Sequence, residues 1–294
     1  MHSRIKIFTA AIITAGLFGI QLAGADPLKQ AWQLAGFKTP ESVLYDKAHD
    51  RLIVGNMNGA PDAVDGNGYL SLIARDGQFI KPDWATGLDA PKGMAISGGK
   101  LFVSDITRLR VIDLETGKIL TTLAPEKAVF LNDVTAADNG DVYVTDMLAN
   151  RIYRYSGGKV ELWLESVDLK TPNGIVADGQ RLIVGSWGTG MRADFSTEQL
   201  GGLLGVDMAT KAITPFPNAS GFANVDGIVT FPGNIYVSDY MKGTLFHVAD
   251  DQAPEAVARF KPGSADIGSD EEDTIYVPMM NEGEVHALKL APRS

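Results

Sequence analysis

A short apolar strand motif occurs six times along the chain, and this repetition limits the possible fold more than any other feature. The copies are LIVG at 52, LFVSD at 101, VYVTD at 142, LIVG at 182, IYVSD at 235 and IYVPM at 275. Their first residues are 49, 41, 40, 53 and 40 positions apart. Strand-rich repeats with a period near forty are typical of a β-propeller, in which each repeat forms one four-stranded blade.

Each repeat has the same internal plan of strands and tight turns. In the third, DVTAA is followed by an Asn-Gly turn, the strands VYVTD and RIYRYS, a Gly-Gly turn and KVELWL. Asn-Gly and Gly-Gly between strand-like runs are hairpin signals. No window combines a helical period with capping residues, so a parallel α/β fold is excluded. The sequence predicts an all-β protein with six four-stranded antiparallel blades.

The two ends of the chain indicate how the ring closes. The last repeat shows strands near Ala265–Gly268, Thr274–Val277 and Val285–Leu290 and then stops, whereas the largely apolar segment Ala31–Phe37 precedes the first repeat. An open array of blades would leave sheet edges unpaired. We therefore predict that Ala31–Phe37 forms the outer strand of the sixth blade and closes the ring.

The first 25 residues have the pattern of a secretory signal. Arg4 and Lys6 precede an apolar run that ends in Ala23-Gly24-Ala25. The run is short for a membrane span, and no stop-transfer pattern follows it. We expect cleavage after Ala25, export to the periplasm or the medium without a membrane anchor, and one propeller domain over residues 26–294.

The composition excludes several kinds of partner and chemistry. The formal net charge is −10, and loss of the signal segment removes two basic residues and no acidic one. An acidic chain without Lys/Arg clusters argues against nucleic acid or an anionic membrane as partner. With no cysteine, neither a thiol nucleophile nor a cysteine metal site is possible. The chain also lacks a Gly-x-Ser-x-Gly nucleophile motif. A closed propeller has no structural need to oligomerise, so we expect a monomer.

A polar residue stands nine to eleven positions before each of the six strand motifs. The set is Glu41, Lys92, Asn132, Asn173, Asp226 and Asp266. The innermost strand of each blade lines the central channel of a propeller, so these side chains are expected to converge at one channel mouth. Each residue taken singly is more simply explained by solvation or by a turn. Their shared position in all six repeats favours a common site.

The chemistry of this set suits a divalent metal ion. Carboxylate and amide oxygens are the ligands of hard cations, and neither sulfur nor imidazole is needed. Carboxylates crowded together without a cation would raise one another's pKa. We predict one divalent cation, with Ca²⁺ favoured and Zn²⁺, Mg²⁺ and Mn²⁺ left open.

Three motifs and an early glutamate resemble a known family. Leu131-Asn132-Asp133, Pro172-Asn173-Gly174 with the following VADGQRLIVGSWG, Val225-Asp226-Gly227, and Glu41 in the first blade are similar to the senescence-marker-protein/gluconolactonase (regucalcin-like) family of six-bladed propellers. The resemblance implies a divalent cation held by Glu41, Asn173 and Asp226. It also implies that Asn132 contacts metal-bound water or substrate.

The chain departs from that family at two places. Lactonases of the family have Glu-Gly-Pro-x-Trp in the first blade, whereas Glu41 is followed here by Ser42 and Val43. They also have an arginine two residues before the Asn-Asp pair, where this chain has Phe130. Loss of that arginine puts sugar lactones in doubt, and Phe130 suggests a more apolar ligand.

Two long insertions are expected to surround the same channel mouth. They are Asn56–Asn67 in the first blade and Trp187–Gly201 in the fourth, and they account for the two widest spacings of the repeat. Because antiparallel strands alternate direction, these loops lie at the end where the innermost strands begin. Trp187, Met191 and Phe195 either line an apolar pocket there or pack within their own loop.

Two classes of function remain open. The first is a metal-dependent hydrolase of a lactone or related ester, in which the cation polarises the carbonyl and Asp226 acts as proton shuttle. Its substrate contacts would come from Lys92, Phe130, Asn132, Trp187 and Asp266. The second is a non-catalytic propeller that binds a small ligand or a protein partner, since propellers host both functions. A strictosidine-synthase-like or paraoxonase-like relative is a third possibility with the same architecture.

Overall fold

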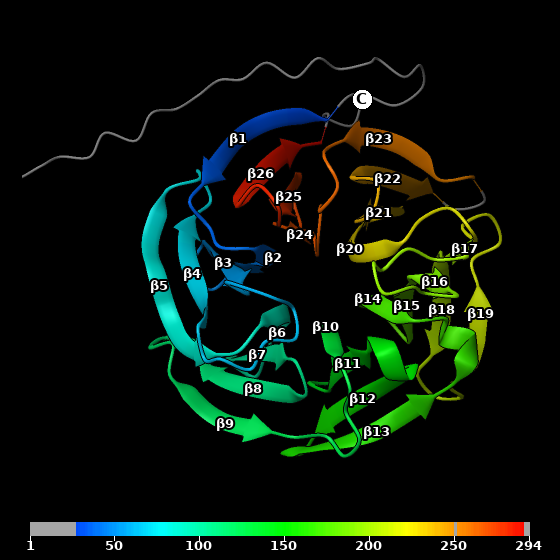
Figure 1. Cartoon of the computed structure of the whole chain (residues 1–294), viewed down its shortest axis with the longest axis horizontal. Coiled ribbons are helices and arrows are strands. Elements are labelled where there is room, and N and C mark those ends of the chain that lie inside the picture. Colours follow the sequence, from blue (N-terminus) through cyan, green and yellow to red (C-terminus); the bar gives the residue numbers. More distant parts are fainter. Residues whose placement is uncertain (1–27, 250–251, 291–294) are drawn as a thin grey trace, which may run out of the picture.

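Six four-stranded antiparallel sheets surround a central axis in the computed structural model, which describes residues 28–249 and 252–290 (Figure 1). The predicted all-β fold with six blades is confirmed. None of the helices in this part of the chain is long and apolar enough to cross a membrane. The predicted signal segment lies outside the described residues.

Each of the first five blades is built from one continuous stretch of chain, with its strands in order from the axis outward. Blade 1 contains β2 (Pro40–Asp46), β3 (Arg51–Asn56), β4 (Gly68–Ala74) and β5 (Phe79–Leu88), and blade 2 contains β6 (Pro91–Ser97), β7 (Lys100–Asp105), β8 (Arg108–Asp113) and β9 (Ile119–Leu123). Blade 3 contains β10 (Leu131–Ala136), β11 (Val142–Asp146), β12 (Arg151–Ser156) and β13 (Lys159–Glu165). Two single-turn 3₁₀ helices follow β11 and β13, η1 (Met147–Ala149) and η2 (Val167–Leu169).

The remaining blades include one insertion and the ring closure. Blade 4 contains β14 (Pro172–Asp178), β15 (Arg181–Ser186), β18 (Leu203–Asp207) and β19 (Ile213–Pro215), and its insertion forms the two-stranded β16 (Gly188–Thr189) and β17 (Gln199–Leu200). Blade 5 contains β20 (Val225–Phe231), β21 (Asn234–Asp239), β22 (Thr244–Ala249) and β23 (Glu255–Arg259). Blade 6 contains β24 (Gly268–Ser269), β25 (Thr274–Met279), β26 (Glu284–Lys289) and the N-terminal β1 (Lys29–Ala35).

The N-terminal strand closes the ring as predicted. β1 pairs antiparallel with β26, from Lys29 opposite Lys289 to Ala35 opposite Glu284. The strand ends two residues before the predicted Phe37, because Gly36 takes a positive φ of 115° and turns the chain. The backbone N–H groups of Gly36 and Phe37 both donate to the carbonyl of Gly283, which fixes this turn against blade 6.

The apolar runs of the repeat reflect burial on both faces of each sheet. Leu52, Ile53 and Val54 in β3 are all fully buried. Leu52 packs with residues of blade 6, whereas Ile53 packs with residues of blade 2. Successive strand residues point to opposite faces, and here each face meets a neighbouring blade. This is why the second strands read LIVG or VYVTD rather than alternating apolar and polar residues.

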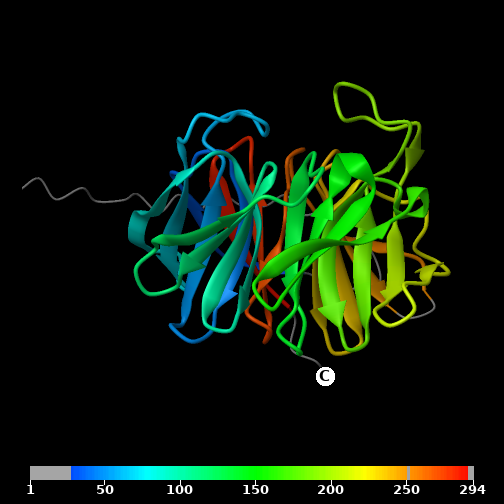
Figure 2. The ribbon, with the colours of Figure 1, turned by 90° about the horizontal axis from the view of Figure 1, so that it is seen from below.

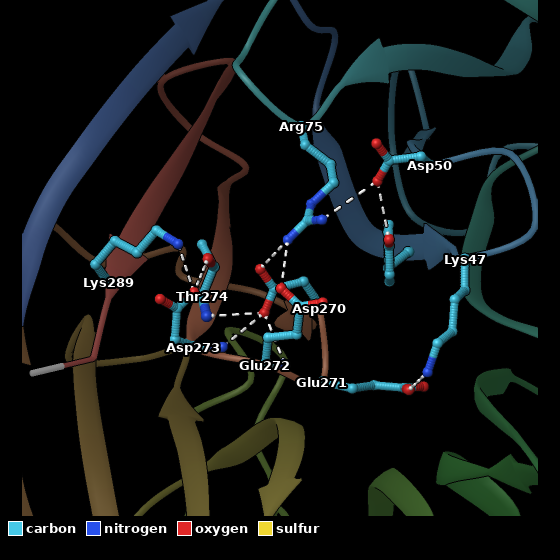
Figure 3. A network of polar contacts seen from close by, with 10 residues as sticks. Lys47, Asp50, Arg75, Asp270, Glu271, Glu272, Asp273, Thr274 and Lys289 are labelled. Atoms are coloured by element: carbon cyan, nitrogen blue, oxygen red, sulfur yellow. Dashed lines mark hydrogen bonds and ion pairs between the residues drawn. The ribbon is translucent and has the colours of Figure 1, made fainter. Parts of the chain in front are cut away.

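A network of charges reinforces the seam between blades 1 and 6 (Figure 3). Arg75 donates to the buried carboxylate of Asp270 over 2.8 Å and to Glu272 over 3.2 Å. Although burial acts in the opposite direction, hydrogen bonds from Thr274 and other donors hold the pKa of Asp270 at about 2. The more exposed Lys47 pairs with Glu271 over 2.9 Å. The seam where the ends of the chain meet therefore has ionic contacts in addition to strand pairing.

Both long insertions rise from the same face of the ring (Figure 2). They comprise residues 57–67 between β3 and β4, and residues 187–202 between β15 and β18. We call this side the insertion face. The Lys92 ammonium, at the start of the innermost strand β6, donates to the carbonyl of Pro61 in the first insertion over 2.7 Å. The insertions therefore lie at the end of the channel where the innermost strands begin.

Candidate metal centre at the channel mouth

A bulge occurs at the start of the innermost strand in each of the first five blades. In β10 the pairing moves from Leu131 opposite Asp146 to Val134 opposite Val144, so that Asn132 and Asp133 face a single residue. The same irregularity contains Glu41 in β2, Lys92 in β6, Asn173 in β14 and Asp226 in β20. A bulge redirects side chains that regular pairing would place differently. The predicted polar residues therefore share one backbone feature as well as one sequence position.

Glycine follows three of these residues for a steric reason. A Cβ on Gly174 would overlap the carbonyl oxygen of Asp226, and one on Gly227 would overlap the backbone of Asp266 and Ile267. Neither glycine has a positive φ. The Asn-Gly and Asp-Gly pairs are therefore not turns, and they mark places where the innermost strands of adjacent blades approach closely.

Hydroxyl groups of the preceding blade fix the backbone at these positions. Ser42 donates to the carbonyl of Lys92 over 2.6 Å, and Thr145 donates to the carbonyl of Asn173 over 2.8 Å. Ser104 makes the equivalent bond to the carbonyl of Asn132. In blade 6, the N–H of Asp266 donates to the carbonyl of Glu41 over 2.9 Å. The backbone of the site is held between blades, and its side chains are left for the channel mouth.

Four side chains of this set lack partners for a buried oxygen. Glu41, Asn132, Asn173 and Asp226, called the polar ring below, are each 6% exposed or less. Their atoms Glu41 Oε2, Asn132 Oδ1, Asn173 Oδ1 and Asp226 Oδ1 are four of the seven buried side-chain N or O atoms without a hydrogen-bond partner in the described part of the chain. A buried unsatisfied polar atom is costly and calls for an explanation. Oxygens from four different blades meeting at one mouth point to a shared cationic ligand.

The electrostatics of the polar ring disfavour negative charge in the absence of a cation. Burial, followed by the charge of Asp133, raises the pKa of Asp226 to about 8, while the Asn173 side chain, within hydrogen-bonding reach, opposes the shift. Burial and then the charge of Asp226 raise the pKa of Glu41 well above its ordinary value, although Lys92 acts in the other direction. A divalent cation would compensate both carboxylates.

The donor set fits a hard cation. Two carboxylates and two amide oxygens are ligands of the kind that Ca²⁺ accepts in flexible oxygen sites. Within residues 28–249 and 252–290, no three His, Cys, Asp or Glu side chains gather as a metal-binding group. The polar ring differs from such groups because two of its four unpaired oxygens belong to asparagine amides. This composition argues against a site built for a soft or imidazole-bound metal.

Lys92 and Phe130 form one unit at the mouth. The Lys92 ammonium donates to the carbonyls of Pro61 and Ala90 over 2.7 and 3.1 Å, and it lies 4.5 Å from the centroid of the Phe130 ring. Burial lowers the pKa of Lys92 to about 8, while the charge of Glu41 favours its ionised form. The structure brings both predicted residues together, and it directs the ammonium toward the first insertion and the aromatic face.

Asp266 belongs to a deeper part of the channel. Its carboxyl hydrogen-bonds to that of Asp133, and burial and then the charge of Asp133 raise the pKa of Asp266 well above its ordinary value. Asp133 also accepts from the N–H of Ile175 over 2.7 Å. Both aspartates line a channel cavity of about 420 Å³ that continues along the innermost strands toward residues such as Tyr45 and Glu271. Asp266 lies apart from the insertion loops, so its predicted contact with substrate would come from the channel side.

An apolar residue follows the second strand of every blade. The six are Met57, Ile106, Met147, Trp187, Tyr240 and Met280, called the apolar collar below. They fall into two clusters, one with Ala90 and one with Phe130, Met191, Phe195 and Met241. Trp187 is the one collar residue among the predicted site residues. The other five occupy the same position in their repeats, directly after LIVGN, LFVSD, VYVTD, IYVSD and IYVPM. An alignment of the six repeats would therefore have identified them.

Trp187, Met191 and Phe195 follow the second of the two interpretations left open by the sequence, in which the insertion packs on itself and on the neighbouring collar. The Trp187 indole N–H donates to the carbonyl of Phe195 over 2.9 Å, so the insertion does pack on itself. The Trp187 ring also lies 5.7 Å from that of Tyr240, centroid to centroid. The charges of Asp226 and Glu41 contribute, after burial, to raising the pKa of Tyr240 to about 12. The insertion is thus linked through Tyr240 to the polar ring.

The chain matches no protein-family model, and no curated protein matches it in sequence. Several solved structures share its architecture. A candidate gluconolactonase is 16% identical, with a TM-score of 0.63 over 91% of this chain and 93% of that one. Virginiamycin B lyase from Staphylococcus aureus, with quinupristin, is 15% identical, with a TM-score of 0.59 over 90% of this chain and 100% of that one. A streptogramin B lyase is 13% identical, with a TM-score of 0.57 over 90% and 97%.

At these identities the similarity establishes a shared fold.

Proposed function

We propose that this protein is a divalent-cation-dependent hydrolase of a lactone or related ester. The observation that carries the proposal is the set of four buried, unpaired oxygens that four blades present at one channel mouth. A candidate gluconolactonase among the proteins of the same fold supports it. Lyases share the fold as well, so the choice of hydrolysis rests on the site and on the family resemblance.

Glu41, Asn173 and Asp226 would hold the cation through their unpaired oxygens. When bound, a divalent cation acts as a Lewis acid toward an ester or lactone carbonyl and stabilises the negative charge that develops on its oxygen. Asn132 Oδ1, the fourth unpaired oxygen, would accept a hydrogen bond from water or substrate. Both roles, binding the cation and accepting a hydrogen bond, use oxygens that have no hydrogen-bond partner in the protein, so no existing contact of these oxygens has to be broken.

Asp226 is the proposed proton shuttle. Without a cation, burial raises the pKa of Asp226 to about 8, and a cation bound by the carboxylate would lower that pKa and keep the group ionised. An ionised carboxylate within hydrogen-bonding reach of the attacking water can accept its proton. Asp226 would take the proton of the attacking water and return it to the leaving oxygen.

A non-catalytic binding protein is the second candidate. Phe130 occupies the place where the resemblance expects a substrate-binding arginine. The Lys92 ammonium, which lies over that phenyl ring, is already bonded to two carbonyls. The site therefore lacks the free basic group that the resemblance expects to contact a sugar lactone. This favours a protein that binds its ligand and does not hydrolyse it.

The two candidates are separated by a hydrolysis screen. Lactones and aryl esters would be tested with Ca²⁺, Mg²⁺, Mn²⁺ or Zn²⁺ added to chelator-treated protein. The hydrolase predicts turnover that requires a cation, is lost in Asp226→Asn and is kept in Asp178→Asn, a change at the far end of β14. Full activity in Asp226→Asn would refute the assignment of this residue. No turnover across a broad panel, together with cation binding, would favour the binding protein.

Export as a monomer belongs to the same proposal. Cleavage after Ala25 would leave a chain that begins at Asp26. The mass of the protein recovered from the periplasm or medium tests this cleavage, and light scattering tests the monomer. An uncleaved chain retained with membranes would contradict cleavage and export, and a multiple of the chain mass in light scattering would contradict the monomer.

A further inference from the structure

Lys92 is the only basic side chain among the six recurring polar residues of the channel mouth. Building on the proposed function, we infer that Lys92 is a fixed counter-charge that competes with the divalent cation for Glu41. Lys92 thereby sets the cation concentration at which the site is loaded. It acts through its charge and not as a ligand of the cation.

Lys92 occupies a place at which other blades present oxygen ligands. The bulge at the start of β6 contains Lys92. The same bulge in three other blades contains Glu41, Asn173 and Asp226. The Lys92 carbonyl accepts from Ser42 of blade 1 over 2.6 Å, and a hydroxyl of the preceding blade fixes Asn173 in the same way. The backbone therefore presents an amine in blade 2 where blades 1, 4 and 5 present oxygens.

The Lys92 ammonium is buried and carries its charge without an ion pair. Lys92 is 2% exposed, and its Nζ donates to the carbonyls of Pro61 and Ala90 over 2.7 and 3.1 Å. It also lies 4.5 Å from the centroid of the Phe130 ring, whose face attracts a cation. Over the residues that the structure describes, Lys92 has no carboxylate partner within 4.0 Å. Burial lowers the pKa of Lys92 to about 8, so most of the amine is still protonated at pH 7.

Glu41 is the carboxylate on which this charge acts most strongly. The charge of Glu41 opposes the lowering of the Lys92 pKa more than that of any other carboxylate. Asp105, the next in order, already pairs with Arg110 over 2.7 Å. Glu41 is 4% exposed, and its Oε2 has no hydrogen-bond partner. Two buried groups of opposite charge therefore interact without an ion pair, and the Glu41 oxygen stays free for a cation.

A cation bound to Glu41 must overcome repulsion from Lys92. It adds positive charge near a buried ammonium, and burial reduces the screening that water and salt provide. The repulsion is proportional to the charge of the cation. Lys92 therefore weakens cation binding, and it does so more for an ion of higher charge. The hydrogen bond from Lys92 to Pro61 gives the competing explanation, in which Lys92 only holds the first insertion.

Removing the charge should tighten cation binding. Chelator-treated wild type, Lys92→Met and Lys92→Gln would be titrated with Ca²⁺ by calorimetry. Methionine replaces the amine with an apolar group, whereas glutamine keeps amide hydrogens that can bond to the Pro61 carbonyl. Both variants should bind Ca²⁺ more tightly, by on the order of tenfold or more.

Two further variants control for the loss of a lysine. Lys92→Arg keeps the charge and should retain the weaker affinity of the wild type. Lys47→Met removes an exposed lysine that follows the far end of β2, and it should leave the affinity unchanged. Ca²⁺ affinity that is unchanged or weaker in both Lys92→Met and Lys92→Gln would show that Lys92 only holds the insertion, and it would overturn the inference.

The charge of the added ion separates repulsion from a structural role. Tb³⁺ is a hard cation that prefers oxygen ligands, and its luminescence reports binding directly. If Lys92 acts by repulsion, the logarithm of the tightening should be about 1.5 times larger for Tb³⁺ than for Ca²⁺. Equal tightening for the two ions would contradict repulsion as the cause.

These titrations need no substrate, which separates the role of Lys92 from hydrolysis. Tightening in the Lys92 variants without turnover of any lactone or ester supports the counter-charge and argues against the hydrolase. Cation-dependent hydrolysis without tightening keeps the hydrolase and overturns the counter-charge. Absence of cation binding by the wild type and by every variant overturns both.

Discussion

Replacing Asp226 with asparagine should make the cation-free protein more stable, although the residue lies at the centre of the proposed site. The substitution keeps the shape of the side chain and removes its charge. Asp226 is almost completely buried, and its pKa of about 8 lies far above the value of 3.8 expected for an unperturbed aspartate. Between these values the native state keeps a proton that the unfolded chain releases. The free energy of unfolding therefore falls as pH rises from about 4 to about 8.

The size of the effect follows from the two pKa values. Each pH unit in this window lowers the free energy of unfolding by about 1.4 kcal/mol per group. From pH 4 to pH 7 the wild type should lose on the order of 3–4 kcal/mol through Asp226, a loss that an asparagine does not share. For a domain of this size, 1 kcal/mol corresponds to about 2–4 °C in the unfolding midpoint. A divalent cation at a hundred times its Kd should restore about 2.7 kcal/mol to the wild type and nothing to the variant.

The assay is thermal unfolding of chelator-treated protein between pH 4 and pH 8, with and without Ca²⁺. Asp226→Asn should match the wild type near pH 4, exceed it increasingly toward pH 8, and show no response to Ca²⁺. Asp178→Asn, which removes a half-exposed carboxylate far from the mouth, controls for net charge. If Asp226→Asn is less stable than the wild type throughout the range without cation, the carboxylate is compensated by the protein itself and the reasoning is refuted.

Three further predictions concern the site and the ring. Calorimetric Ca²⁺ affinity of the wild type should weaken as pH falls below about 8, because Asp226 must release its proton to bind; a constant affinity down to pH 5 would argue against Asp226 as a ligand. Arg75→Met should lower the free energy of unfolding in urea by about 1.5–3 kcal/mol, because it leaves the buried carboxylate of Asp270 in blade 6 without a charged donor. Lys47→Met removes an exposed ion pair and should cause no measurable change. Gly174→Ala should lower the free energy of unfolding by at least about 2–3 kcal/mol, because the new Cβ overlaps the Asp226 carbonyl. Gly59→Ala is the matched control, since Gly59 has space for a Cβ. Equal stability of the two variants would contradict the close packing of the innermost strands.

The fold could be predicted because every blade of a propeller repeats the same local pattern of strands and turns. Leu52 and Ile53 are apolar in sequence because both faces of β3 meet a neighbouring blade, and the same need recurs in each repeat. The predicted end of β1 was wrong by two residues, because Gly36 turns the chain where it contacts Gly283, a residue far away in sequence that directly precedes β26. Local patterns report burial well, and they report contacts between distant residues poorly.

The polar ring was visible in sequence as a shared position, but its construction was not. The bulge that contains Asn173 depends on pairing across β14 and β15, and the requirement for Gly174 depends on the backbone of the next blade. Likewise, nothing near Lys92 in sequence indicates that its ammonium lies over Phe130 and bonds to Pro61. These features arise where three separate parts of the chain meet. The collar residue Tyr240 is different, because the alignment of the six repeats already contains it.

The central claim is that the polar ring binds a divalent cation. The most direct test is anomalous diffraction from crystals of the chelator-treated protein soaked in Mn²⁺, with Ca²⁺ as competitor. The account predicts one anomalous peak at the channel mouth, within bonding distance of oxygens from Glu41, Asn173 and Asp226, that Ca²⁺ displaces and that Asp226→Asn abolishes. A mouth without a peak at saturating Mn²⁺, or a peak that persists in Asp226→Asn, would contradict it.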